Sequence, residues 1–168
     1  MSFKIITISR EFGSGGRFIG EQIAQKCGIE FYDKKIIEHV AKELGISEQI
    51  VANQGEYAPA GSIFSYAFVG RDITGVSLSD QIFNIQQKLI KDIAQKEPCV
   101  IVGRCADYIL SDRDDVLNVF IEANTPEKAA RIKKLYQKSD DEVKKLLKDV
   151  DKKRSVNYLS LIHISEPT

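Results

Sequence analysis

The stretch that decides the fold is IITISREFGSGGRFIG, residues 5–20. Ile5–Ile8 is a β-branched run, as expected of a strand buried on both faces. The run Gly13–Gly16 interrupts this strand, and apolar residues from Phe18 to Cys27 then recur at helical spacing before Gly28. A glycine-rich turn between a strand and a helix leaves backbone N–H groups unpaired beside the positive end of the helix dipole. The stretch therefore predicts a seat for a phosphate-bearing ligand.

Five consecutive residues are expected to form this cradle: Gly13, Ser14, Gly15, Gly16 and Arg17. Glycine allows positive φ angles and lets a phosphate approach the backbone. The serine adds a hydroxyl group, and the arginine adds a charged donor in the first helical turn. A charge-assisted hydrogen bond of this kind contributes about 1.5–3 kcal/mol. A tight turn that binds nothing is the simpler alternative, but it needs fewer small residues than are present.

Two phosphate-binding patterns compete for the loop, and neither is complete. The dinucleotide pattern Gly-x-Gly-x-x-Gly would use Gly13 and Gly15, but its third position is Phe18. Asp33, after the second expected strand, is the acidic residue that this pattern requires further along. The dinucleotide interpretation therefore stays open.

The P-loop pattern Gly-x-x-x-x-Gly-Lys-[Ser/Thr] fits if Gly15 is its second glycine. Its first glycine is then replaced by Arg10, its lysine by Gly16 and its hydroxyl residue by Arg17. Arginine is a permanent cation suited to phosphate oxygens, so Arg17 could supply the missing charge.

The rest of the chain alternates strands and helices, which predicts an α/β fold with parallel pairing in a three-layer α/β/α sandwich. Four strands are expected, including Cys99–Val102 and Val116–Ile121. The region from Ile46 to Leu78 is expected to be a mobile, partly helical insert. Helix caps are expected at Asp33, Ser79, Thr125 and Ser139. Ligands of such folds bind at the carboxyl ends of the strands.

The composition narrows the class of protein. The chain has 168 residues, one domain's worth, and a formal net charge of zero. We therefore expect neither nucleic acid nor a membrane as a partner. The three cysteines show no metal-ligand spacing and no signal peptide is evident, which favours reduced thiols and a cytoplasmic protein.

Residues 6–17 and 99–108 together closely resemble the cytidylate kinase-like family of P-loop proteins. The resemblance covers about residues 4–158. It implies a P-loop after the first strand, an acceptor-binding insert at about 34–95 and a helical lid at about 126–155. The implied activity transfers the γ-phosphoryl group of ATP to CMP or dCMP, with Mg²⁺ as cofactor and no metal ligands assigned.

The resemblance also implies roles for individual residues. Arg104 would contact the acceptor phosphate, with Asp33 and Asp107 beside the acceptor. Arg17, Arg104, Arg131 and Arg154 would be the catalytic cations around the transferring phosphate. ATP and a small nucleotide-like acceptor are therefore the expected partners.

Two departures from the family pattern modify these expectations. Loss of the P-loop lysine favours, as the alternative, a catalytically impaired nucleotide-binding protein with a regulatory or structural role. A dinucleotide-binding redox protein is a third and weaker alternative. Residues 159–168 differ from the family pattern and are expected to be a foreign tail on a truncated product, which would leave a fifth strand missing and a sheet edge uncovered.

Overall fold

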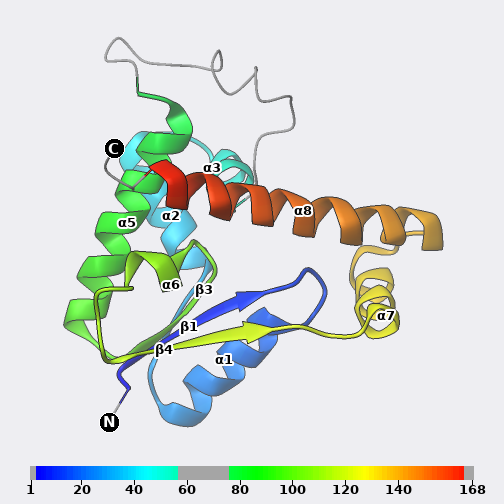
Figure 1. Ribbon diagram of the computed structural model, residues 1–168, viewed down its shortest axis with the longest axis horizontal. Helices are drawn as coiled ribbons and strands as arrows, with labels where there is room; N and C mark the ends of the chain where they lie inside the picture. The colour runs from blue at the N-terminus through cyan, green and yellow to red at the C-terminus, as the bar shows by residue number, and fades with distance from the viewer. Residues whose placement is uncertain (1–2, 57–75, 165–168) are drawn as a thin grey trace.

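The computed structural model describes residues 3–56 and 76–164. Most of the insert expected between Ile46 and Leu78 lies outside the described residues. The described elements alternate between strand and helix along most of the chain (Figure 1). They are β1 Ile5–Arg10, α1 Gly16–Cys27, β2 Glu30–Tyr32, α2 Lys34–Leu44, α3 Glu48–Glu56, α5 Leu78–Lys96, β3 Cys99–Val102, α6 Ala106–Ile109, β4 Val116–Ile121, α7 Thr125–Tyr136 and α8 Asp140–Ile164.

The sheet of the described residues has four parallel strands in the order β2-β3-β1-β4. The predicted α/β class, parallel pairing and strand number are thus confirmed. Strands β3 and β4 match the predicted ranges residue for residue. Because β1 lies centrally between β3 and β4, the loop that follows it emerges in the middle of the carboxyl edge of the sheet.

Alternate residues of β1 and β3 face two separate cores, which makes the predicted three layers. Ile5 and Ile101 pack with α2, α3, α5 and α6, whereas Ile8 and Val102 face α1. The four residues of β3 are all completely buried. This explains why the sequence of β3 is continuously apolar rather than alternating.

Two of the predicted helix caps are wrong by one or two residues. Helix α5 is capped by Ser77 rather than Ser79, because the Ser77 hydroxyl accepts from the Asp80 amide and the Asp80 carboxylate accepts in return. Helix α7 is capped by Asn124 rather than Thr125, because the Asn124 side chain accepts from the Glu127 amide at 2.9 Å. The capping box at Ser139 is confirmed.

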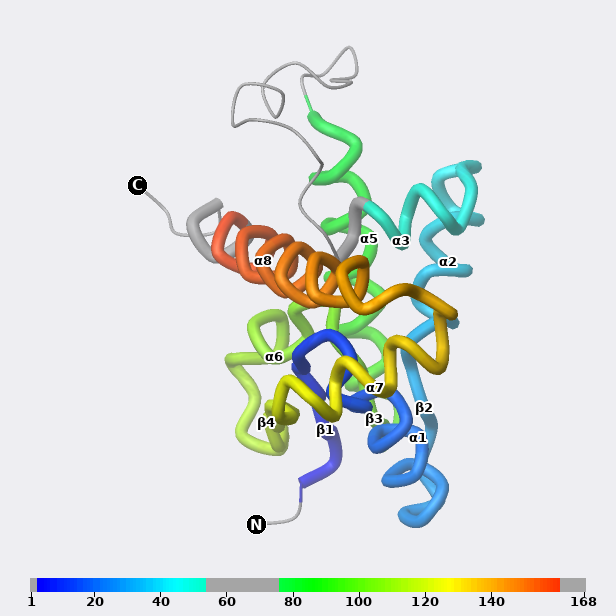
Figure 2. The backbone as a smooth tube through the Cα atoms, turned by 90° about the vertical axis from the view of Figure 1, so that its right-hand side faces the viewer, coloured from blue at the N-terminus to red at the C-terminus, as the bar shows by residue number. Residues whose placement is uncertain are grey.

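Helix α8 runs across the molecule from α7 back over α6, and α7 lies across the carboxyl ends of β1 and β4 (Figures 1 and 2). A separate small core holds α7 and α8 together, with Ile132 on one helix and Val143 and Leu147 on the other. The two helices therefore frame the loop after β1. None of the described helices combines the length and apolar composition needed to cross a bilayer.

Candidate functional site at the carboxyl edge of the sheet

The loop between β1 and α1 needs glycine at two positions. Gly13 has a φ of 80° and Gly15 a φ of 89°, both in the left-handed region that side chains disfavour. The predicted requirement for positive φ angles is therefore confirmed. Gly13 also lies close under α7, since a Cβ there would come within 2.7 Å of Ile132 Cδ1.

The backbone amides of this loop are partly occupied by the protein itself. The Phe12 amide donates to Asp151 Oδ1 at 2.6 Å, and the Ser14 amide to the Glu11 carbonyl at 3.3 Å. For the amides of residues 13 and 15–17, the described part of the chain supplies no hydrogen-bond acceptor. These four N–H groups, at the start of α1, are what an anion would bind.

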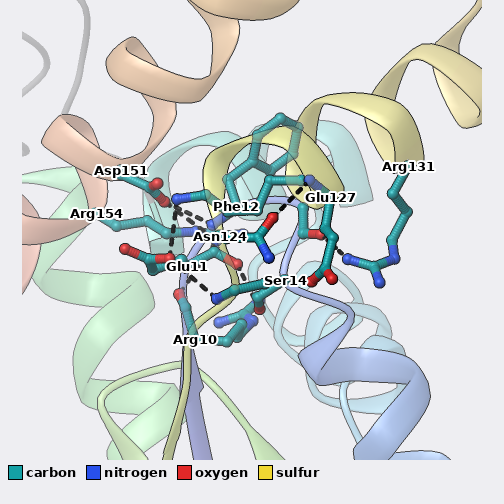
Figure 3. Close-up of polar contacts among 12 residues, drawn as sticks. Arg10, Glu11, Phe12, Ser14, Asn124, Glu127, Arg131, Asp151 and Arg154 are labelled. Atoms are coloured by element: carbon teal, nitrogen blue, oxygen red, sulfur yellow. Dashed lines mark hydrogen bonds and ion pairs between the residues drawn. The ribbon is translucent and has the colours of Figure 1, made fainter.

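Basic residues reach the loop from both covering helices (Figure 3). From α7, Arg131 Nη1 donates to the Gly13 carbonyl, and its guanidinium lies beside Gly15. From α8, Arg154 Nη1 donates to the Arg10 carbonyl at 3.4 Å, and its guanidinium lies 5.7 Å from the Phe12 ring centroid. Two arginines predicted from the sequence are thus brought to the loop.

An ion pair fixes α7 to the base of the loop. Lys128 Nζ lies 2.9 Å from Glu11 Oε2, and the lysine side chain is only 11% exposed. Glu11 also accepts from the Ala123 amide at 3.4 Å. The hydrogen bond from Lys128 is the main cause that lowers the pKa of Glu11. Glu11 is therefore a charged clamp that holds the loop, β4 and α7 together.

The second motif, after β3, folds into an unusual turn. Gly103, Arg104 and Cys105 all have positive φ angles, of 71°, 60° and 54°. Arginine and cysteine rarely adopt this conformation, and each such residue costs about 1 kcal/mol or more. Strain of this kind persists where the surrounding structure imposes it, and functional sites are its usual location. The turn buries Arg104 to 4% exposure.

A cavity of about 480 Å³ opens where these parts meet. Its size is in the range typical of small-molecule sites. It lies beside the loop and beneath α8, at the carboxyl ends of β1 and β3. Its lining residues are Ser9, Arg10, Glu11, Gly103, Arg104, Cys105, Asp107, Phe120, Asp151, Arg154, Ser155, Asn157 and Tyr158.

One wall of the cavity carries a polar cluster around Asp107. Asp107 Oδ2 accepts from Tyr158 at 3.2 Å and from Ser9 at 3.4 Å, whereas its buried Oδ1 accepts no hydrogen bond within the described residues. Burial, followed by the nearby Asp107 carboxylate, raises the pKa of Tyr158 to about 12. Tyr158 therefore stays a neutral hydrogen-bond donor at physiological pH.

Of the predicted site residues, Arg104, Asp107 and Arg154 line this cavity, whereas Gly13–Arg17, Asp33 and Arg131 do not. Arg17 Nε pairs with Asp33 Oδ2 at 3.1 Å, and the Arg17 side chain is 63% exposed. Neither residue lines the cavity. The roles predicted for Arg17 in donor binding and for Asp33 in acceptor binding remain predictions, and the pair bridges α1 to the start of α2.

Several residues that line the cavity are not among those predicted from the sequence. Phe120 belongs to β4, and Ser155, Asn157 and Tyr158 belong to α8. For Ser155 and Tyr158 the sequence signal is spacing, because positions 151, 154, 155 and 158 recur every three or four residues and so share one helix face. No group of three or more His, Cys, Asp or Glu residues in the described ranges could hold a metal ion by itself.

A parallel β2-β3-β1-β4 sheet with a glycine loop after β1, and with arginines gathered at its carboxyl edge, has the fold of a P-loop kinase. Solved structures with this fold include shikimate kinase from Bacteroides thetaiotaomicron, with 18% identity and a TM-score of 0.53, covering 93% of this chain and 81% of that one. TT1252 from Thermus thermophilus has 16% identity and a TM-score of 0.51, covering 85% and 78%.

The chain belongs to the cytidylate kinase-like family, whose model matches residues 5–165. The resemblance inferred from the two motifs is therefore confirmed. An uncharacterized protein from Eubacterium ventriosum ATCC 27560 has a similar structure, with 28% identity and a TM-score of 0.65, covering 92% of this chain and 74% of that one. No curated protein matches the chain significantly.

Proposed function

We propose that this protein is a cytoplasmic ATP-dependent phosphotransferase that moves the γ-phosphoryl group of ATP to a nucleoside monophosphate of the CMP or dCMP type. Membership of the cytidylate kinase-like family supports a kinase-type activity. The observation that carries the proposal is the cavity itself, in which Arg10, Arg104 and Arg154 meet beside a loop with free backbone amides. Three guanidinium groups at one cavity suit a reaction between two phosphates.

In this proposal the chain positions two phosphates and stabilises the charge between them. The loop amides bind the donor, and Arg104 holds the acceptor phosphate in the cavity. An oxygen of the acceptor phosphate then bonds to the γ-phosphorus of ATP while the bond to the β,γ-bridging oxygen breaks, and ADP leaves. Arg131 and Arg154 stabilise the charge that develops, which is the main task of the protein in phosphoryl transfer.

Magnesium fits the residues that are present. Mg²⁺ in kinase sites is held by one or two carboxylates together with the substrate phosphates, so a dedicated cluster of ligands is unnecessary. Asp107 would be a ligand, because it lines the cavity and its Oδ1 accepts no hydrogen bond within the described residues. When bound, the ion would neutralise phosphate charge.

A second candidate function is nucleotide binding without turnover. Gly16 stands at the P-loop lysine position, and the Asp151 carboxylate accepts the hydrogen bond of the Phe12 amide. Both features fit a protein that retained the pocket and lost the chemistry. The dinucleotide alternative lacks such support, since β3 rather than β2 lies next to β1, unlike the strand order of dinucleotide-binding folds.

One experiment separates these candidates. The full chain is incubated with ATP, Mg²⁺ and each of a panel of nucleoside monophosphates, and nucleoside diphosphates are quantified by ion-exchange chromatography. Product above the ATP-only control supports the kinase, and CMP or dCMP is expected to give the most. If calorimetry detects ATP binding but no acceptor gives product, the second candidate is supported. If neither ATP binding nor product is detected, both candidate functions are overturned.

A further inference from the structure

The side chain of Arg10 occupies the space next to Gly16, where the P-loop pattern places its lysine. A Cβ atom on Gly16 would come within 2.7 Å of Arg10 Cβ and 2.9 Å of Arg10 Cγ. Real Cβ atoms almost never approach so closely, and these are stem atoms rather than the mobile end of a side chain. Position 16 therefore has no room for lysine while position 10 is arginine.

The P-loop pattern has glycine at position 10 and lysine at position 16, whereas this chain has arginine and glycine. Glycine and a basic residue have thus exchanged positions in the sequence, and in the structure the side chain of Arg10 lies in the space beside Gly16. The guanidinium of Arg10 continues past Gly16 to Gly103, against which its Nη1 lies. Arg10 also lines the cavity, while its backbone ends β1 at the base of the loop.

From this exchange we propose that Arg10 supplies the phosphate-binding cation that P-loop kinases take from the lysine. Arg10 is the better candidate than Arg17, whose guanidinium is exposed and paired with Asp33 outside the cavity. A guanidinium is longer than an ammonium and keeps its charge at every physiological pH. It can thus reach the terminal phosphates of a donor from position 10. The inference rests on the proposed function, because it assumes that the donor is ATP.

The test is to exchange the two residues back. The variants are Arg10→Ala, Gly16→Lys and the double variant Arg10→Gly/Gly16→Lys, with ATP affinity measured by calorimetry in Mg²⁺ and phosphoryl transfer measured in parallel. Arg10→Ala should weaken ATP binding about 10- to 100-fold, the effect of losing a charge-assisted phosphate contact. Gly16→Lys alone should weaken it as well. The double variant should recover affinity to within about 10-fold of the original chain, which a merely structural role of Arg10 would not allow.

Arg113→Ala is the matched control, because Arg113 pairs with Asp115 at the opposite end of the sheet. Thermal unfolding checks each variant, and Arg10→Gln, which keeps the stem without the charge, replaces Arg10→Ala if that variant does not fold. Unchanged affinity on neutralising Arg10, or a double variant that binds ATP no better than Arg10→Ala, overturns the inference and leaves the proposed function standing. An original chain that binds no ATP overturns both.

Discussion

The Phe12 amide and the Asp151 carboxylate are 139 residues apart in the chain and are joined by a 2.6 Å hydrogen bond. The bond places a negative charge from α8 on the loop that is proposed to bind phosphate (Figure 3). An anionic ligand would meet this charge as it entered. The bond thus links the position of α8 to the occupancy of the loop.

Asp151→Asn should therefore strengthen ATP binding. Asparagine keeps an oxygen that accepts from Phe12 but removes the like charge, whose repulsion at a partly solvated site amounts to about 1 kcal/mol, or roughly 5-fold in affinity. Calorimetric titration with ATP at low and high salt measures the effect, which should shrink as salt rises. Asp149→Asn, an exposed position on the same helix, is the control. Weaker binding by Asp151→Asn would show instead that the carboxylate helps to hold the ligand.

A stability cycle tests the contact between Arg10 and Gly16 without any ligand. Replacing a glycine in a helix by alanine normally stabilises a protein by about 0.5–1 kcal/mol. Here the new Cβ would collide with Arg10, so Gly16→Ala should destabilise by about 1–3 kcal/mol. In an Arg10→Gly background the same change should be neutral or stabilising. Urea denaturation of the original chain, the two single variants and the double variant gives the coupling free energy between positions 10 and 16. Additive changes in the free energy of unfolding would contradict the contact.

Tyr158 should titrate near pH 12 in the folded protein. An unfolded tyrosine titrates near pH 10, so the neutral Tyr158 contributes stability that is full below pH 10 and is lost as the pH rises toward 12. Asp107→Asn should lower this pKa, because it removes the nearby negative charge while the burial remains. The absorbance of tyrosinate, measured as the difference from Tyr158→Phe, reports the titration. A midpoint near 10 in the original chain would be inconsistent with the cluster.

Lys128→Ala should destabilise the protein by roughly 1–3 kcal/mol at pH 7, since it leaves the Glu11 charge without its main partner. Because the pKa of Glu11 is lowered, this contribution is present above the ordinary glutamate range and is lost as the pH falls below that range through the lowered pKa. Lys133→Ala, which breaks an exposed pair with Asp140, is the matched control and should cost under about 0.5 kcal/mol. Equal losses of unfolding free energy for Lys128→Ala and Lys133→Ala would show that the Glu11–Lys128 pair does not hold the loop and α7 together.

The sequence predicted the layers, strands and loop well, because these depend on local patterns. Strands buried on both faces are continuously apolar, as at Cys99–Val102, and glycine runs break them. The cap errors arose where two candidates stood close together. Ser77 precedes α5 and Ser79 lies in its first turn, and the carboxylate of Asp80 decides between them by returning a hydrogen bond to Ser77.

The site was harder to predict, because it combines segments far apart in the chain. Arg104 and Arg154 line the cavity, and Arg131 donates to the Gly13 carbonyl in the loop, whereas their predicted roles stay predictions. Arg17 follows the glycines in sequence, but the first turn of α1 directs it toward Asp33. Spacing alone could not show which face of α8 would turn to the cavity, so Tyr158 was missed.

Helix α8 has Asp151 and Arg154 at the loop and Asn157 and Tyr158 in the cavity wall. Residues 151 and 158 are about 10 Å apart along the helix axis. Such a short helical segment moves as one body, so a ligand that shifts it at one end presents a changed surface at the other. The binding of donor and acceptor would consequently be coupled, and each would change the affinity for the other by the same factor. In calorimetry, a saturating concentration of one substrate would change the Kd of the other by that factor.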